Sequence, residues 1–131
     1  MSCLFDSDVV IDFFHNKKPG VDLVRKFITK KPCISIITWL EITYGIKKRE
    51  EQRGRAQEFE HFITDFAIQI IPIDKKVADY YLDTKISLEK KKCPLADFDL
   101  LIASSALAYG LTLVTRNSKH FSRIEKLSVA K

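Results

Sequence analysis

Short apolar runs alternate with longer amphipathic stretches along the whole sequence. Four apolar runs have the length of β-strands and lie at residues 3–5, 33–37, 68–73 and 111–115. A weaker fifth run lies at 127–130. The intervening stretches place apolar residues at helical spacing, so the pattern predicts strands and helices in alternation.

The predicted helices have recognisable ends. Thr38, Asp74 and Asp97 are expected to cap three helix starts, because short polar side chains accept hydrogen bonds from free backbone N–H groups. Gly110 is expected to end the third of these helices. The almost wholly polar stretch 47–58 predicts the solvated tip of a helical hairpin.

Alternating strands and helices predict an α/β fold. Parallel β-α-β units with right-handed crossovers place helices on both faces of a parallel sheet. The 131 residues contain no repeat and no linker, which favours one domain over 1–131. In such open sheets chemistry gathers at the carboxyl ends of the strands, so polar residues there are the candidates for function.

Composition and charge narrow the class of protein. A hydrophobic share of 46% with 30% charged residues excludes a disordered chain. The 22 Lys and Arg residues exceed the 17 Asp and Glu residues, and the net charge of +5 favours a polyanionic partner such as nucleic acid. No apolar run is long enough to cross a bilayer and the start lacks a signal-peptide pattern, so no membrane association is expected.

The cysteines and histidines are scattered. Three cysteines without CxxC spacing predict neither a disulfide framework nor a structural zinc site. Cys3 and Cys33 lie in apolar runs and are expected to be buried thiols. This cysteine usage predicts a reducing compartment, the cytoplasm.

Two carboxylates follow the first predicted strand. Asp6, Ser7 and Asp8 could each cap the next helix, but three capping candidates exceed what one helix needs. Asp6 is therefore the stronger candidate for function, and Asp8 the weaker.

Glu41 lies one turn into the helix after the 33–37 run. Thr38-Trp39-Leu40-Glu41 matches a capping box, so a structural role for Glu41 stays open. Its apolar neighbours, however, predict a mostly buried helix, and a buried carboxylate requires a partner or a metal.

Asp99 shares a helical face with Ile102 and Ala103 and has no capping role if Asp97 is the cap. This position favours a functional role. The alternative is a buried ion pair with an arginine, for which the candidates are Arg25, Arg116 and Arg123.

The 111–115 run ends in polar residues. Thr115 and Asn117 could simply close a turn. In a functional interpretation, Asn117 orients a water or a metal ligand and Arg116 contacts a phosphate. Basic residues of the 47–58 stretch are further candidates for contacts with a nucleic-acid backbone.

The acids Asp6, Glu41 and Asp99, in a chain of net positive charge, indicate a binding site for a divalent cation. Crowded carboxylates are stable in the ionised form when a cation bridges them. Oxygen ligands without clustered His or Cys select Mg²⁺ or Mn²⁺ over zinc. Such an ion activates water and neutralises charge on a phosphodiester, so Asp6, Glu41 and Asp99 are the candidates for metal-dependent cleavage of nucleic acid.

Four segments, in this order, resemble the PIN domain and in particular the VapC-like toxins of prokaryotic toxin–antitoxin pairs. They cover nearly the whole chain and are Asp6-Ser7-Asp8-Val9-Val10-Ile11-Asp12, the stretch 34–45 around Glu41, Asp99-Leu100-Leu101-Ile102-Ala103, and Leu113-Val114-Thr115-Arg116-Asn117 with His120-Phe121.

The resemblance implies a three-layer α/β/α sandwich around a parallel sheet of four or five strands, with metal-dependent endoribonuclease activity. It carries Asp6, Glu41 and Asp99 over as the acidic, metal-binding triad. Asn117 stands where many members have a fourth acid, which puts a second tightly held metal in doubt.

Around this triad, Asp8, Thr115 and Arg116 are expected to contact the RNA substrate. The resemblance also implies a homodimer and a cognate antitoxin, whose C-terminal segment lies over the site along residues 47–66.

Two other functions fit parts of the sequence. Asp6-Ser7-Asp8 after an apolar strand also matches the nucleophile motif of haloacid-dehalogenase-type phosphatases, but the later Thr, Lys and acidic pair of that family do not follow in order. A PIN-like scaffold that binds nucleic acid or protein without cutting is the other alternative. The intact acids at positions 6, 41 and 99 argue against it.

Overall fold

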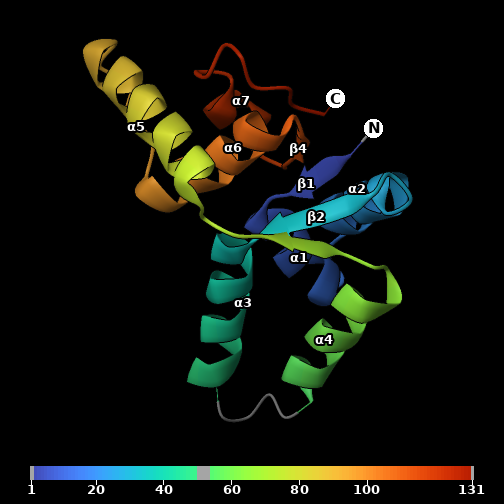
Figure 1. Ribbon diagram of the computed structural model, residues 1–131. Helices are drawn as coiled ribbons and strands as arrows, with labels where there is room; N and C mark the ends of the chain where they lie inside the picture. The colour runs from blue at the N-terminus through green and yellow to red at the C-terminus, as the bar shows by residue number, and fades with distance from the viewer. Residues whose placement is uncertain (1, 50–53, 131) are drawn as a thin grey trace.

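A parallel sheet forms the centre of the computed structural model, which describes residues 2–49 and 54–130 (Figure 1). Within these residues the sheet has four strands in the order β3-β2-β1-β4. The strands are β1 (Cys3–Phe5), β2 (Pro32–Ser35), β3 (Gln69–Ile71) and β4 (Thr112–Val114). All three strand pairs are parallel, as the alternating pattern predicts.

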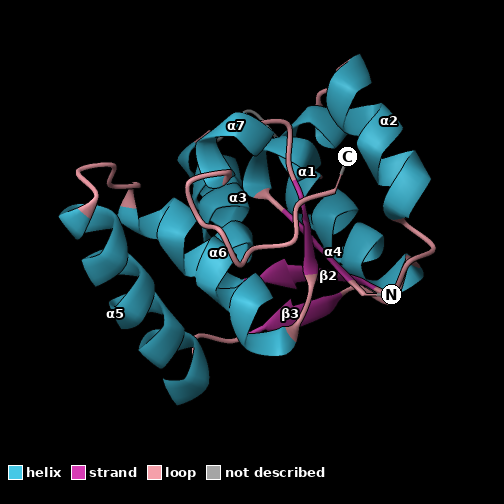
Figure 2. Ribbon diagram, turned by 90° about the horizontal axis from the view of Figure 1, so that it is seen from above, coloured by secondary structure: helices cyan, strands magenta, loops and turns pink. Residues whose placement is uncertain are grey.

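Helices cover both faces of the sheet. In the described residues they are α1 (Ser7–Phe14), α2 (Lys18–Phe27), α3 (Ile36–Lys48), α4 (Arg55–Asp65), α5 (Lys75–Lys90), α6 (Asp97–Tyr109) and α7 (Ser118–Phe121). Figure 1 shows α1 to α4 on one side of the sheet and α5 to α7 on the other. Seen from above, α5 and α2 lie at opposite edges of the molecule (Figure 2). The three-layer α/β/α prediction is confirmed.

The sheet separates two hydrophobic cores. Leu4 and Leu113 pack in the core under α5 and α6, whereas Cys3 and Phe5 pack in the core under α1 to α4. Successive strand residues point to opposite faces, so three residues of β1 serve both cores. Cys3 and Cys33 are both buried thiols, as expected, and burial raises the pKa of Cys3 to about 11.

The strand order reverses between β1 and β4. The chain builds β1, β2 and β3 outward in one direction and then places β4 on the other side of β1. Phe5 pairs with Val114, and the Asp6 N–H donates to the Val114 carbonyl at 2.9 Å. Asp6 and Thr115 therefore leave the sheet side by side, at the switch point where open α/β sheets bind ligands.

Two of the predicted helix caps are wrong and two helix ends are confirmed. Ser35, not Thr38, caps α3: its Oγ accepts from the Ile37 N–H at 3.0 Å, because β2 ends at Ser35 and the helix begins one residue later. Ala96 takes the cap position of α6 without a side-chain bond, and Asp97 instead accepts from Tyr81 and Lys85. The cap at Asp74 and the left-handed Gly110 at the end of α6 follow the prediction.

The predicted hairpin tip lies partly outside the described residues, because 50–53 are not among them. On its far side Gly54 adopts a left-handed φ of +88° and α4 follows. The weak run at 127–130 does not form a strand; Val129 makes one isolated bridge to Leu113. No helix in the described part of the chain is both long and apolar enough to cross a membrane.

Candidate active site at the sheet edge

Asp6 is both a helix cap and a deeply buried acid of the site. Its Oδ1 accepts from the Ser7 N–H at 2.8 Å, and its Oδ2 accepts from the Thr115 hydroxyl at 2.8 Å. The residue is only 5% exposed. Burial, the Asp8 charge and, to a lesser extent, the Asp99 charge raise the pKa of Asp6 to about 7 against the two hydrogen bonds. A buried carboxylate with neutral donors therefore stands at the end of β1.

Asp8 lies beside Asp6 and carries an unsatisfied oxygen. Its Oδ2 is 3.5 Å from the Thr115 hydroxyl and 4.0 Å from Arg116 Nε, and its Oδ1 is buried without a hydrogen-bond partner. Burial raises the pKa of Asp8, although Arg116 opposes the rise. Buried polar atoms in proteins normally have a partner, so Asp8 Oδ1 is an acceptor that a bound cation would satisfy.

Glu41 reaches the same edge from α3. The Ser7 hydroxyl donates to Glu41 Oε1 at 2.7 Å, and Ser7 Oγ also lies 2.9 Å from Thr38 Oγ1. Thr38 lies inside the helix, so the capping box fails and Glu41 is free for another role. The prediction of a mostly buried helix is wrong, since Leu40 and Tyr44 are 45% and 63% exposed.

Asp99 lies in the first turn of α6 with 38% of its side chain exposed. Its Oδ2 is 3.3 Å from His120 Nε2, so the alternative of an ion pair with an arginine is wrong. The charge of Asp99 contributes, as the smallest of the causes, to the raised pKa of Asp6. His120 belongs to the resembling segments without a predicted role; as the third residue of α7 it reaches Asp99 at the start of α6.

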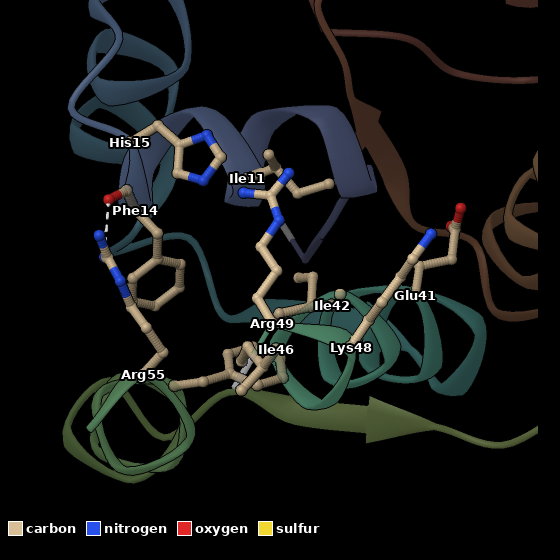
Figure 3. Close-up of a pocket in the computed structure, with 11 residues that line it drawn as sticks. Ile11, Phe14, His15, Glu41, Ile42, Ile46, Lys48, Arg49 and Arg55 are labelled. Atoms are coloured by element: carbon tan, nitrogen blue, oxygen red, sulfur yellow. Dashed lines mark hydrogen bonds between the residues drawn. The ribbon is translucent and has the colours of Figure 1, made fainter. Parts of the chain in front are cut away.

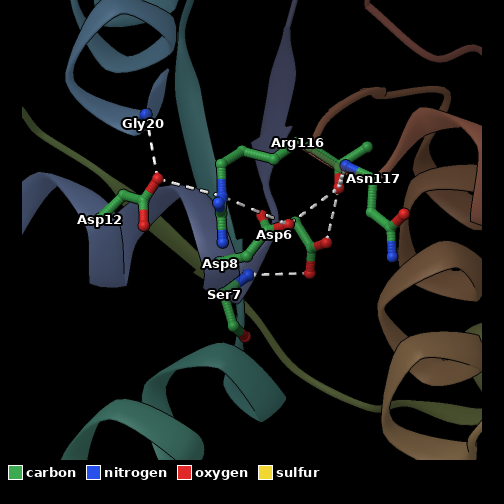
Figure 4. A network of polar contacts seen from close by, with 8 residues as sticks. Asp6, Ser7, Asp8, Asp12, Gly20, Arg116 and Asn117 are labelled. Carbon is green, nitrogen blue, oxygen red and sulfur yellow. Dashed lines mark hydrogen bonds and ion pairs between the residues drawn. The ribbon is translucent and has the colours of Figure 1, made fainter. Parts of the chain in front are cut away.

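Arg116 is half-exposed but is held at the rim of the acids by an ion pair. Its Nε lies 3.0 Å from Asp12 Oδ2, and this Asp12 oxygen also accepts from the Gly20 N–H at 3.2 Å (Figure 4). Asp12 is 3% exposed and was not recognised as a site residue from the sequence. The available signal was an acid in a helix whose other buried residues include Val9 and Val10.

Thr115 connects the end of β4 to the acids. Its hydroxyl donates to Asp6 and accepts from the Asn117 N–H at 3.0 Å, so it closes a turn and contacts a site residue at once. Asn117 itself is exposed and takes the cap position of α7 without a side-chain capping bond. The structure thus brings Thr115 into the cluster through its side chain and Asn117 through its backbone.

The donor set of this edge suits a hard divalent cation. It consists of carboxylates, which are ligands that hard cations prefer. The pKa values of Asp6 and Asp8 are raised, and Asp8 also has a buried oxygen without a hydrogen-bond partner. With the side chains as they stand, no three His, Cys, Asp or Glu residues of the described chain are grouped around one point that could hold an ion. Ser7 engages one oxygen of Glu41 and His120 lies next to one oxygen of Asp99, so each of these carboxylates has a second oxygen that could bind an ion.

A pocket of about 400 Å³ opens next to Glu41, between α1, α3 and α4 (Figure 3). Its walls are mainly apolar, and cationic side chains stand around them. Arg55 is fixed there by donating to the Phe14 carbonyl at 3.1 Å. Figure 3 shows Arg49 extending from the end of α3 toward Ile11 and His15. The pocket therefore joins an apolar groove to the acidic edge of the sheet.

Comparison with known families decides the relationship. The PIN domain model matches residues 3–127 of this chain. The chain belongs to the PIN-domain family. The matched range runs from β1 to beyond α7 and so includes Asp6, Glu41, Asp99 and the turn after β4.

Named relatives and solved structures agree with this membership. This PIN-domain chain is 36% identical over 95 residues to "Ribonuclease VapC2" of Rickettsia felis, covering 72% of the chain and 69% of the relative. It is 27% identical over 121 residues to "tRNA(fMet)-specific endonuclease VapC" of Shigella flexneri, covering 92% and 90%. The crystal structure of VapBC2 from Rickettsia felis bound to a promoter DNA fragment aligns with a TM-score of 0.87 and 26% identity, over 99% of this chain and 98% of that one.

Proposed function

We propose that this chain is the toxin of a toxin–antitoxin pair, an endoribonuclease that hydrolyses RNA phosphodiesters with a carboxylate-held Mg²⁺ or Mn²⁺. The observation that carries the proposal is the pair Asp6 and Asp8 at the switch point, joined by the Thr115 hydroxyl, with a buried Asp8 oxygen left unsatisfied. Its ribonuclease relatives support RNA as the substrate.

Asp6, Glu41 and Asp99 would hold the ion, with Asp8 beside them. A bound Mg²⁺ or Mn²⁺ supplies a water of lowered pKa and neutralises charge on the phosphate. The chain's own part is orientation: Thr115 and the Ser7 N–H fix the Asp6 carboxylate, and the Ser7 hydroxyl fixes that of Glu41. In this proposal Asn117 fixes Thr115 through its N–H, which is a positioning contribution to the catalytic set.

Cleavage of RNA with metal or with EDTA tests the proposal. The relative from Shigella flexneri is named for tRNA(fMet), so labelled tRNA(fMet) is the first substrate, with an unstructured RNA beside it. Cleavage with Mg²⁺ or Mn²⁺ is expected to stop with EDTA. The variants Asp6→Asn, Glu41→Gln and Asp99→Asn are each expected to lower the rate by roughly 100-fold or more, since each removes a charge from the ion's ligands.

Asp22→Asn is the matched control, because Asp22 pairs only with Lys18 in the described contacts and both side chains are exposed on α2. It is expected to cleave at the rate of the unchanged chain. RNA binding without cleavage in the native chain, under all metal conditions, would favour the non-cutting scaffold. Hydrolysis of a phosphomonoester in place of RNA would favour the phosphatase.

An antitoxin is the proposed protein partner, as the VapBC complexes among the structural relatives suggest. The groove between α3 and α4 beside Glu41 offers apolar surface for a segment of such a partner. Co-expression with a cognate antitoxin gene is expected to yield a stable complex and to suppress cleavage. Ile46→Asp in the groove is expected to weaken that complex, whereas Thr29→Asp, at an exposed position outside the groove, serves as its control.

We also propose that the toxin is a homodimer. Exposed apolar side chains on α3 and α5 offer surface for self-association; they are Leu40, Tyr44, Tyr80, Leu82 and Ile86. Light scattering is expected to give twice the chain mass of 15.1 kDa. A mass of one chain at micromolar concentration would contradict the dimer without affecting the proposed activity.

A further inference from the structure

Asp12 and Arg116 form an ion pair that the chemistry proposed above does not use. Asp12 comes from the middle of α1 and Arg116 from the turn after β4, and they meet with Nε 3.0 Å from Oδ2. The Asp12 side chain is 5% exposed, against 43% for Arg116. The buried Asp12 thus holds the half-exposed Arg116 at the rim of the acidic cluster, which here means Asp6 and Asp8 with Glu41 and Asp99.

The α1–α2 junction is shaped to hold Asp12. The Gly20 N–H donates to Asp12 Oδ2 at 3.2 Å, and a Cβ on Gly20 would lie 2.1 Å from Asp12 Cβ and 2.8 Å from the Val9 carbonyl oxygen. Only glycine permits this approach. The oxygen that accepts from Gly20 is the one that pairs with Arg116, so the backbone of α2 fixes the position of the arginine's partner.

The anchored arginine stands next to Asp8 without fully engaging it. Arg116 Nε is 4.0 Å from Asp8 Oδ2, beyond hydrogen-bond length, and Asp8 Oδ1 has no partner. Figure 4 shows the Arg116 guanidinium between Asp12 on one side and Asp8 on the other, with the shorter contact to Asp12. Without Asp12, Arg116 could turn toward Asp8 and Asp6, because guanidinium groups and carboxylates prefer close, bidentate contact.

From this geometry we infer that Asp12 is a positioning residue: it holds the Arg116 guanidinium back from the acidic cluster and so sets how tightly the cluster binds a divalent cation. Arg116 acts as an internal competitor of that cation, restrained by Asp12. The inference rests on the proposed function, since it concerns the same cluster. It also gives Arg116 a role other than the phosphate contact expected from the sequence.

Mn²⁺ binding to the metal-free chain, measured by electron paramagnetic resonance of the free ion, tests this without any activity. Arg116→Gln is expected to tighten Mn²⁺ binding by about tenfold, because it removes a positive charge about 4 Å from Asp8. Asp12→Asn is expected to weaken binding by a similar factor, because it releases the arginine toward Asp8 and Asp6. The isosteric Asn can still accept from the Gly20 N–H.

The double variant separates this mechanism from a simple loss of charge. If Asp12 acts only by holding Arg116, Asp12→Asn changes Mn²⁺ affinity less than about twofold once Arg116→Gln is present. An equal loss in both backgrounds would show that Asp12 acts through its own charge and would overturn the inference. Weaker binding in Arg116→Gln would also overturn it, because it would make the arginine a support of the site.

The failure of the proposed function would look different. In that case the unchanged chain would bind no Mn²⁺ in the micromolar to millimolar range, or Asp6→Asn would bind it as well as the unchanged chain does. Asp22→Asn, which removes one exposed carboxylate from α2, is the control for net charge and is expected to leave Mn²⁺ affinity unchanged. Circular dichroism of each variant checks that the fold is retained.

Discussion

The hydroxyl of Ser7 lies 2.7 Å from Glu41 Oε1 and joins the start of α1 to the first turns of α3. Ser7 is 7% exposed, and its backbone N–H donates to Asp6. One residue therefore orients two acids that are 35 positions apart in the chain, Asp6 through its amide and Glu41 through its side chain. The relative placement of these acids depends on a neutral residue between them.

Ser7→Ala is expected to reduce RNA cleavage by about tenfold and to cost roughly 1 to 2 kcal/mol of stability, because it removes a hydrogen bond to a charged group. Initial cleavage rates and urea unfolding measure the two effects. Ser7→Thr keeps the hydroxyl and is expected to restore most of the rate. An Ala variant as active as the unchanged chain would show that Glu41 needs no such support.

Gly20→Ala is expected to destabilise the fold by about 3 kcal/mol, because the new methyl group would overlap Asp12 and the α1 backbone and force both to move. Gly45→Ala is the matched control. A Cβ at Gly45 meets nothing within 4 Å, so this helix-interior change is expected to stabilise the chain by about 1 kcal/mol. Urea unfolding compares them, and equal effects would contradict the close approach at Gly20.

Ser35→Ala is expected to cost about 1 kcal/mol, because Ser35 Oγ satisfies the Ile37 N–H at the start of α3. The loss would also loosen the turn that carries Glu41. Thr38→Val is the comparison, since it keeps the shape of the side chain predicted as the cap while removing its hydroxyl. Thr38→Val also removes the contact with Ser7 Oγ, so exchange of the Ile37 amide is the deciding measurement. An Ile37 amide that exchanges no faster in Ser35→Ala than in the unchanged chain would contradict the cap at Ser35.

The order of strands and helices could be predicted because each element has its own pattern. Apolar runs with polar ends mark β1, β2, β3 and β4, and Asp6 and Thr115 were predicted at the carboxyl ends of two of them; their adjacency comes from the pairing of β1 with β4. Parallel pairing follows from the helices between the strands. The fold and the location of the candidate site could therefore be predicted from the residue pattern within each segment.

Contacts between distant segments could not be predicted in the same way. Asp12 pairs with Arg116 only because α2 turns back at Gly20 and β4 returns beside β1. His120 reaches Asp99 only through the placement of α7 against α6. The cap of α3 was misplaced for a simpler reason: β2 ends at Ser35, and element boundaries depend on strand pairing that the sequence pattern does not record.

Stability of the metal-free chain is expected to fall between about pH 4 and pH 7 because of Asp6. Its pKa of about 7 in the folded chain, against 3.8 ordinarily, means that the folded state holds this proton where the unfolded state has lost it, so raising the pH favours unfolding. Asp8 contributes in the same direction. In EDTA, Asp6→Asn is expected to flatten this decline in stability. At pH 7 the variant is expected to be more stable than the unchanged chain by up to about 4 kcal/mol, because a pKa difference of one corresponds to about 1.4 kcal/mol. Urea unfolding from pH 4 to pH 8 measures the free energy of unfolding, with Asp22→Asn as the exposed control. If the free energy of unfolding changed with pH in parallel for Asp6→Asn and the unchanged chain, Asp6 would already be ionised at low pH.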